Sequence, residues 1–72
     1  MATLEAVVKI GERLKDLRIR RALTQEELAE VAGIGKNTVN RLERDLTEPR
    51  PPTLRKLAHA LEVDPAELVA GE

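Results

Sequence analysis

A helix-start signal and a helix-stop signal stand close together in the middle of the chain. Thr24 opens the sequence Thr-Gln-Glu-Glu, where its hydroxyl can accept a hydrogen bond from the amide of Glu27. The Glu27 carboxylate can in turn accept from the amide of Thr24, which completes a capping box. Gly33 follows soon after and can adopt the left-handed conformation that commonly ends helices. Together the signals predict a helix of only about two turns.

A second short amphipathic helix is predicted directly after this turn. Val39 and Leu42 form an apolar stripe together with Ile34. The polar residues fall elsewhere around this helix, from Lys36 onward: Lys36, Asn37, Asn40, Arg41 and Arg44. The small side chain of Ala29 allows the two helices to cross closely, so residues 24–44 are expected to form a helix-turn-helix. The outer face of its second helix is polar and largely cationic.

Helical patterns flank this unit on both sides. Apolar residues that recur in steps of three and four predict a first helix over about residues 4–21, so that residues 1–9 extend it at its amino end. Residues 45–52 hold three of the four prolines and predict a loop. Pro51 suits the first position of a fourth helix, and a short fifth helix is predicted within residues 64–70. No strand pattern occurs, so the expected fold is a compact all-α domain of five helices.

The length of the chain limits it to one small core. A domain near 72 residues buries only roughly 60% of the surface that its unfolded chain exposes, so residues 1–72 are expected to form a single domain. The chain has no cysteine and one histidine, which excludes disulfides, thiol catalysis and multi-histidine metal sites. Neither a cofactor nor an enzyme activity is expected. The apolar stretches are too short for a membrane span or a secretion signal, which favours a cytoplasmic location.

Charge is distributed unevenly along the chain. The formal net charge of −1 argues against nucleic-acid binding, because domains that bind nucleic acids are often distinctly basic. Residues 1–23, however, carry six basic and three acidic side chains, whereas residues 51–72 carry two basic and four acidic ones. The chain is therefore basic early and acidic late.

Five segments of the sequence carry a family resemblance: IGERLKDLR (10–18), TQEELA (24–29), Gly33, TVNRLE (38–43) and TLRKLAHAL (53–61). They resemble the lambda-repressor-like helix-turn-helix family of phage Cro and repressor type, also called the XRE family. The similarity keeps its register over about residues 10–70, which makes it far more specific than an isolated turn motif. It implies a five-helix, lambda-repressor-like transcriptional regulator.

The resemblance assigns roles to the polar residues of the helix-turn-helix. Lys36, Asn37 and Arg41 align with the base-reading positions, with Thr38 and Asn40 as further candidates. Lys and Arg can donate to guanine O6 and N7, and Asn can pair with adenine. Candidate phosphate contacts are Gln25 at a helix amino end, and Arg13, Lys15, Arg44 and Arg50. Taken singly, each of these side chains could equally be an ordinary solvated residue.

The resemblance also implies a structural ion pair between Arg18 and Glu43. Loss of one partner of a buried pair costs roughly 3 to 5 kcal/mol, whereas an exposed pair contributes little. The loop after the second short helix departs from the family, because Asp45 stands where glycine is common and acidic Glu48 follows. Fewer phosphates should then be neutralised, so weaker and less salt-sensitive DNA binding is expected. Ala22 and Gly35 also replace the usual glycine and the usual serine or threonine.

The leading hypothesis is a regulator, most simply a repressor, that binds double-stranded DNA at a palindromic operator as a homodimer. Its half-sites would lie about one helical turn, roughly 34 Å, apart. Val63, Leu68 and Val69 are apolar candidates for the dimer interface, although they could simply close the core. One alternative is a protein-interaction module whose acidic carboxy-terminal helices bind a protein partner. Another is a helix-turn-helix scaffold that has lost DNA binding.

Overall fold

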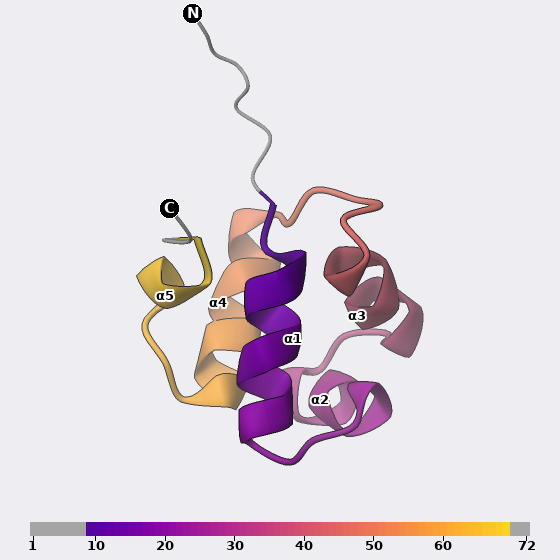
Figure 1. Cartoon of the computed structure of the whole chain (residues 1–72), viewed down its shortest axis with the longest axis vertical. Coiled ribbons are helices and arrows are strands. Elements are labelled where there is room, and N and C mark those ends of the chain that lie inside the picture. The colour runs from indigo at the N-terminus through magenta and orange to yellow at the C-terminus, as the bar shows by residue number, and fades with distance from the viewer. Residues whose placement is uncertain (1–8, 70–72) are drawn as a thin grey trace, which may run out of the picture.

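The computed structural model describes residues 9–69, which form five α-helices. These are α1 (Gly11–Arg20), α2 (Gln25–Ala32), α3 (Lys36–Glu43), α4 (Pro51–Leu61) and α5 (Pro65–Val69). In Figure 1, α1 lies in the middle, with α2 and α3 on one side of it and α4 and α5 on the other. Helix α1 packs on α3 and α5, α2 packs on α3 and α4, and α4 packs on α5. The expected five-helix all-α architecture is confirmed.

The core is built from aliphatic side chains of all five helices. Its largest fully buried side chains, each less than 2% exposed, are Ile10, Leu14, Leu28, Val39, Leu42, Leu57, Leu61 and Leu68. Burial of one such side chain contributes roughly 2 kcal/mol, and the chain has no aromatic residue to add larger contributions. Among residues 9–69 no charged or polar residue as a whole is buried. None of the helices within that range is both long enough and apolar enough to cross a membrane.

Helix α1 starts later than the apolar periodicity predicts. It begins at Gly11, so the expectation of a helix from residue 4 is wrong for Lys9 and Ile10, and residues 4–8 lie outside the described residues. The reason is a contact from a distant segment: the Gly11 amide donates to Asp45 Oδ1 at 3.1 Å. A Cβ atom at Gly11 would lie 2.5 Å from the carbonyl oxygen of Glu43. The start of α1 is thus fitted against the end of α3.

The turn between α2 and α3 follows its sequence signals. The amide of Glu27 donates to Thr24 Oγ1 at 3.0 Å and the amide of Thr24 donates to Glu27 Oε1 at 2.9 Å, so the capping box is confirmed. Gly33 ends α2 with φ 73°, and a Cβ there would meet nothing within 4 Å. The backbone angle, and not lack of space, is therefore what requires glycine. Gly35 takes the N-cap position of α3 without a side-chain cap.

The carboxy-terminal helices close the core from the side opposite α3. Pro51 begins α4 as expected, and the amide of Ala66 donates to Asp64 Oδ1 at 2.9 Å at the start of α5. Leu68 of α5 is only 1% exposed. Of the two roles that the sequence left open for Leu68, a dimer contact or closure of the core, the structure shows Leu68 in the core. Val63 packs partly buried against the same core, and Val69 is 44% exposed.

Within residues 9–69, three residues other than glycine adopt left-handed backbone angles: Ala22 (φ 57°), Asp45 (φ 57°) and Glu62 (φ 59°). This conformation costs an L-residue about 1–2 kcal/mol. We predict that Ala22→Gly stabilises the domain by about 0.5 kcal/mol, since the relief of strain exceeds the entropy that glycine adds to the unfolded chain. Asp45→Gly should instead destabilise it, because the hydrogen bond to the Gly11 amide is lost.

Urea unfolding followed by circular dichroism measures both variants and suits a chain without aromatic residues. The two variants remove the same kind of strain, so each is the control for the other. Equal stabilisation by both would show that the Asp45 carboxylate does not support α1.

Candidate nucleic-acid interface

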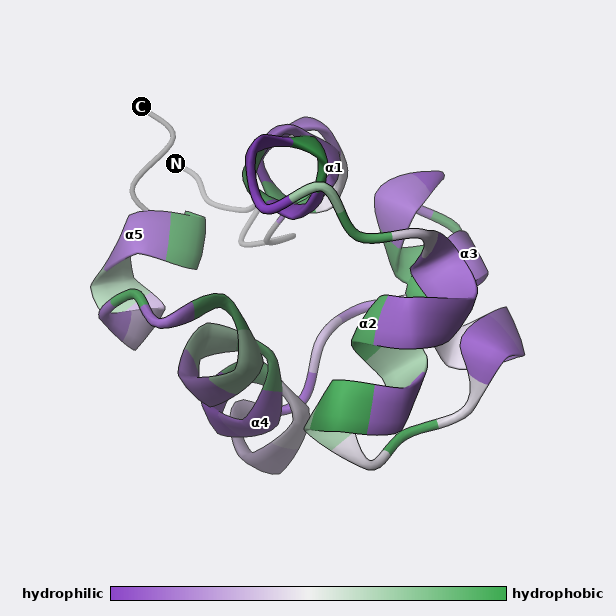
Figure 2. Ribbon diagram, turned by 90° about the horizontal axis from the view of Figure 1, so that it is seen from below, coloured by the Kyte–Doolittle hydropathy of each residue, from purple (hydrophilic) through white to green (hydrophobic). Residues whose placement is uncertain are grey.

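Helix α3 presents a polar face to solvent and buries its apolar face. Val39 is fully buried and Leu42 is 1% exposed, while Ile34 packs partly buried against the core. Of the predicted base-reading residues, Lys36, Asn37 and Arg41 are exposed, and Thr38 and Asn40 are half-buried. Hydrophilic colouring dominates the α3 ribbon in Figure 2. The packing that was expected to hold a polar helix outward is confirmed.

An ion pair between Arg18 of α1 and Glu43 of α3 ties these helices together. Arg18 Nε donates to Glu43 Oε2 at 2.6 Å, and Arg18 Nη2 donates to Glu43 Oε1 at 3.2 Å. The side chains are only 12% and 3% exposed. Arg18 Nη1 also donates to the carbonyl oxygen of Leu23 at 2.7 Å, just before α2. The structure thus contains the pair that the resemblance implied, and in a two-bond geometry that aligns both groups.

The Glu43 carboxylate also orients two further polar side chains, Gln25 directly and Asn40 through Gln25. Gln25 Nε2 donates to Glu43 Oε1 at 3.0 Å, and Asn40 Nδ2 donates to Gln25 Oε1 at 3.2 Å. We call the side chains of Glu43, Gln25 and Asn40 the carboxamide relay. Gln25, predicted to contact phosphate, and Asn40, predicted to read bases, are therefore bonded to each other in the free protein. No sequence spacing indicated this relay, because its members come from α2 and α3 and meet only after the helices pack.

The predicted phosphate contacts do not all lie on one surface. Arg13 is turned toward α5, where its Nε donates to the carbonyl oxygen of Glu67 at 2.7 Å. Lys15, Arg44 and Arg50 are exposed. The structure therefore separates Arg13 from the α3 face and assigns it to the contact between α1 and α5.

The cations on and just after α3 form no salt bridge within the part of the chain that the structure describes. The salt bridges within residues 9–69 all use arginines at or just after α1: Arg13–Glu67, Arg18–Glu43, Arg20–Asp16 and Arg21–Glu62. In that part of the chain no carboxylate lies within salt-bridge distance of Lys36, Arg41 or Arg44. Although the net charge of the chain is −1, the α3 face thus carries cations that no carboxylate of residues 9–69 pairs. Such a face attracts phosphates.

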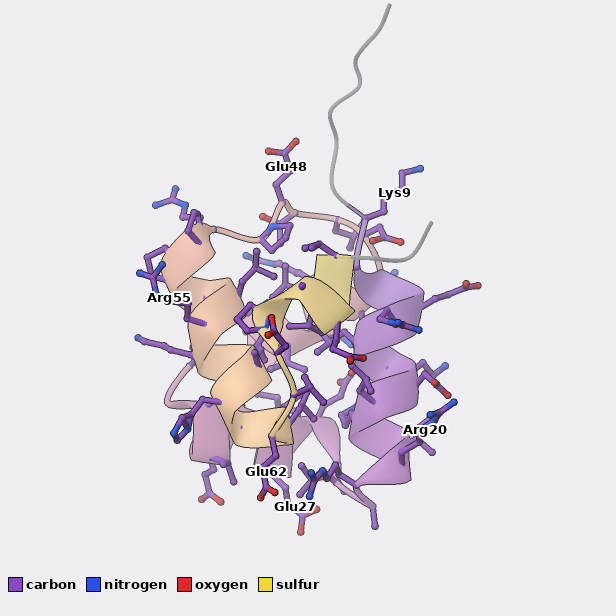
Figure 3. The ribbon with its side chains drawn as sticks, turned by 90° about the vertical axis from the view of Figure 1, so that its left-hand side faces the viewer. Lys9, Arg20, Glu27, Glu48, Arg55 and Glu62 are labelled. Atoms are coloured by element: carbon purple, nitrogen blue, oxygen red, sulfur yellow. The ribbon has the colours of Figure 1, made fainter. Side chains whose placement is uncertain are left out.

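The acidic loop after α3 has a structural use that the sequence did not reveal. The Asp45 carboxylate accepts from the Gly11 amide and so caps α1, whose own N-cap residue Ile10 supplies no side-chain cap. Glu48 projects away from the protein surface in Figure 3. No group of three or more potential metal ligands occurs among the residues that the structure describes.

Comparison with known proteins identifies the family. The sequence profile of the HTH_3 helix-turn-helix family matches residues 14–68, which includes all of α2 and α3. The chain belongs to the HTH_3 helix-turn-helix family. The fold and the resemblance that its sequence segments indicated are thereby confirmed.

Curated proteins similar to this chain are transcriptional regulators. The cryptic phage CTXphi transcriptional repressor RstR of Vibrio cholerae is 43% identical over 60 residues, which are 83% of this chain and 54% of RstR. The HTH-type transcriptional regulator ImmR of Bacillus subtilis is 39% identical over 56 residues, which are 78% of this chain and 44% of ImmR. The chain spans about half the length of these relatives.

Similar solved structures share the arrangement of helices. The restriction-modification controller protein C.AhdI from Aeromonas hydrophila matches with a TM-score of 0.81 and 39% identity, over 86% of this chain and 94% of that protein. The P22 c2 repressor, solved in complex with a synthetic operator, matches with a TM-score of 0.81 and 30% identity. That match covers 88% of this chain and 96% of the repressor chain.

The Arg18–Glu43 pair predicts a large difference between two acidic substitutions. Glu43→Ala should lower the free energy of unfolding by about 3 to 5 kcal/mol, because it leaves the Arg18 guanidinium buried without its counter-charge. Asp16→Ala removes an exposed pair with Arg20 and should cost less than about 1 kcal/mol.

Chemical unfolding at neutral pH, followed by circular dichroism, compares the two variants directly. Both remove one carboxylate and change the net charge equally, so a general charge effect would appear in both. If their stabilities agree within about 1 kcal/mol, the pair does not hold the helices as described.

Proposed function

We propose that this chain is the DNA-binding domain of a transcriptional repressor and that α3 enters the major groove of its operator. The observation that carries the proposal is the division of α3 into a buried apolar face and an exposed face whose cations form no salt bridge with any other described residue. The likeness to RstR, a repressor, and to the P22 c2 repressor, solved with an operator, supports it. An α-helix is about 10–12 Å across with its side chains, so the major groove, which is about 12 Å wide, can admit α3.

Three exposed side chains of α3 supply the chemistry for reading bases. Lys36 and Arg41 can donate to guanine O6 and N7, and Asn37 can bond to adenine N6 and N7. They lie on the solvent side of a helix whose other side is anchored by Val39 and Leu42. A helix anchored in this way can bring side chains to base edges without itself repacking. Thr38 is half-buried and stays a secondary candidate.

The proposed operator is palindromic and is bound by a homodimer. Two copies related by a twofold axis would place their α3 helices in major grooves about one helical turn, roughly 34 Å, apart. Since Leu68 lies in the core, the exposed Val69 is the remaining apolar candidate on α5, with half-buried Val63 beside the core. A dimer with so small an apolar contact would form chiefly on DNA.

Removal of the two reading cations tests the proposed function. Lys36→Ala/Arg41→Ala should weaken binding to a duplex obtained by selection more than about 100-fold, because each bidentate base contact contributes about 1–3 kcal/mol of discrimination. Binding to random duplex should fall far less. Fluorescence anisotropy with labelled duplexes measures both affinities.

A matched control is available on α4. Arg55→Ala/Lys56→Ala also removes one arginine and one lysine, and both are exposed. They lie on α4, and α4 and α3 lie on opposite sides of α1 (Figures 1 and 3). It should keep the preference for the selected duplex. Unchanged selectivity in the α3 variant, or an equal loss in the α4 control, would refute the assignment of α3 as the reading helix.

Salt dependence tests which of the proposed phosphate contacts are made. Arg44→Gln should reduce the slope of log affinity against log salt concentration by about 0.9, because one phosphate is no longer neutralised. Arg13→Gln carries the same charge change but should leave the slope nearly unchanged, since Arg13 bonds to the Glu67 carbonyl. Titrations at several salt concentrations give both slopes. An equal reduction of the slope in both variants would show that Arg13 contacts phosphate.

A further inference from the structure

The orientation of the Asn40 carboxamide is determined from inside the protein. Glu43 is paired with Arg18 and offers only acceptor atoms, so the Gln25 atom 3.0 Å from Glu43 Oε1 must be its amide nitrogen. Gln25 Oε1 is thereby turned toward Asn40 and lies 3.2 Å from Asn40 Nδ2. Because an amide oxygen can only accept, Asn40 must offer its NH2 group. The charge of Glu43 thus sets the direction of both carboxamides.

Asn40 also lies at the edge of the exposed face of α3. It follows Lys36 by four residues and precedes Arg44 by four, so the three side chains form one row along the helix. Both neighbours in this row are exposed, and Asn40 itself is half-buried against α2. Within residues 9–69 no group donates to Asn40 Oδ1. The oxygen of this carboxamide therefore has unfilled acceptor capacity among the described residues.

We infer that Asn40 is a specificity-determining residue whose carboxamide the relay holds with its oxygen available to DNA, so that it selects a base with an exocyclic amino group. This inference rests on the proposed function. In the major groove adenine N6 and cytosine N4 donate, whereas guanine O6 and thymine O4 accept. The preferred base facing Asn40 is therefore adenine or cytosine.

The relay gives this preference because it opposes rotation of the amide. A free asparagine could turn its NH2 group to guanine O6 or thymine O4 as easily as its oxygen to an amino group. If the Asn40 carboxamide rotated by half a turn here, its oxygen would face Gln25 Oε1, and neither of these two acceptors would have a hydrogen to accept. Gln25 cannot rotate to relieve this contact, because its oxygen would then face the Glu43 carboxylate. Glu43 thus acts on base selection as a positioning residue.

Gln25→Met tests the inference because it cuts the relay at its centre. Methionine has a similar length but no donor or acceptor of comparable strength, and the Arg18–Glu43 pair keeps its own hydrogen bonds. Selection of duplexes is carried out with the unmodified protein, Gln25→Met and Asn40→Ala. One base position should prefer adenine or cytosine by about tenfold with the unmodified protein, lose that preference in Asn40→Ala, and fall to about threefold or less in Gln25→Met.

Asn37→Ala provides the matched control within the same helix. Asn37 is exposed and does not belong to the relay, so the base position that depends on Asn37 should keep its preference in Gln25→Met. Gln25→Met also removes the phosphate contact predicted for Gln25. Loss of that contact would lower the affinity for every duplex equally and would not change the ratio of affinities for different bases. The ratio at the Asn40-dependent position is therefore the informative quantity.

A measurement on the free protein tests the relay without DNA. In nitrogen-15 spectra the side-chain NH2 protons of Asn40 should exchange with solvent several-fold more slowly than those of Asn37, and Gln25→Met should abolish the difference. The same rate for both asparagines in the unmodified protein overturns the inference. So does an Asn40-dependent position that prefers guanine or thymine, or one that Gln25→Met leaves unchanged.

The failure of the inference can be told apart from the failure of the proposed function. If the unmodified protein selects no sequence, both fail. If it selects a sequence but Asn40→Ala retains every preference, the repressor proposal stands and Asn40 has no part in selection.

Discussion

The buried carboxylate of Glu43 is the constraint on which the rest of the structure depends. A charge that is 3% exposed is tolerated only with a close counter-charge and with its remaining acceptor capacity filled. Arg18 supplies the counter-charge, and Gln25 supplies a further donor. Because these partners come from α1 and from the start of α2, the carboxylate determines where the end of α3 can lie. The aliphatic core alone, lacking directional contacts, would permit small rotations of α3.

Charge pairing also explains how an acidic chain can present a cationic surface. The arginines at and just after α1 are each bonded to a carboxylate, and two of them also bond to a backbone carbonyl. Lys36 and Arg41 of α3 form no salt bridge with any carboxylate of residues 9–69. Net charge is a sum over the whole chain, whereas attraction of a phosphate depends on the potential at one face. The net charge of −1 is therefore a poor guide to this domain.

Local features of the fold could be predicted from the sequence, and contacts between distant segments could not. The capping box at Thr24 and Glu27 and the left-handed Gly33 depend on residues within one turn, so their signals are legible in the chain. The cap of Gly11 by Asp45 and the bond from Arg13 to Glu67 join residues 34 and 54 positions apart. No periodicity encodes such distances. The Arg18–Glu43 pair was accessible only through the family resemblance.

The close approach of Gly11 to the end of α3 has a consequence for how this domain can vary. A single methyl group at position 11 would collide with the Glu43 carbonyl oxygen, and the same position donates its amide to Asp45. Substitutions at positions 11 and 45 should consequently depend on each other, because residue 11 must leave room for the end of α3 and residue 45 must accept the amide hydrogen of residue 11. The close packing of α3 against α1 therefore depends on the absence of a Cβ atom from Gly11, the first residue of α1.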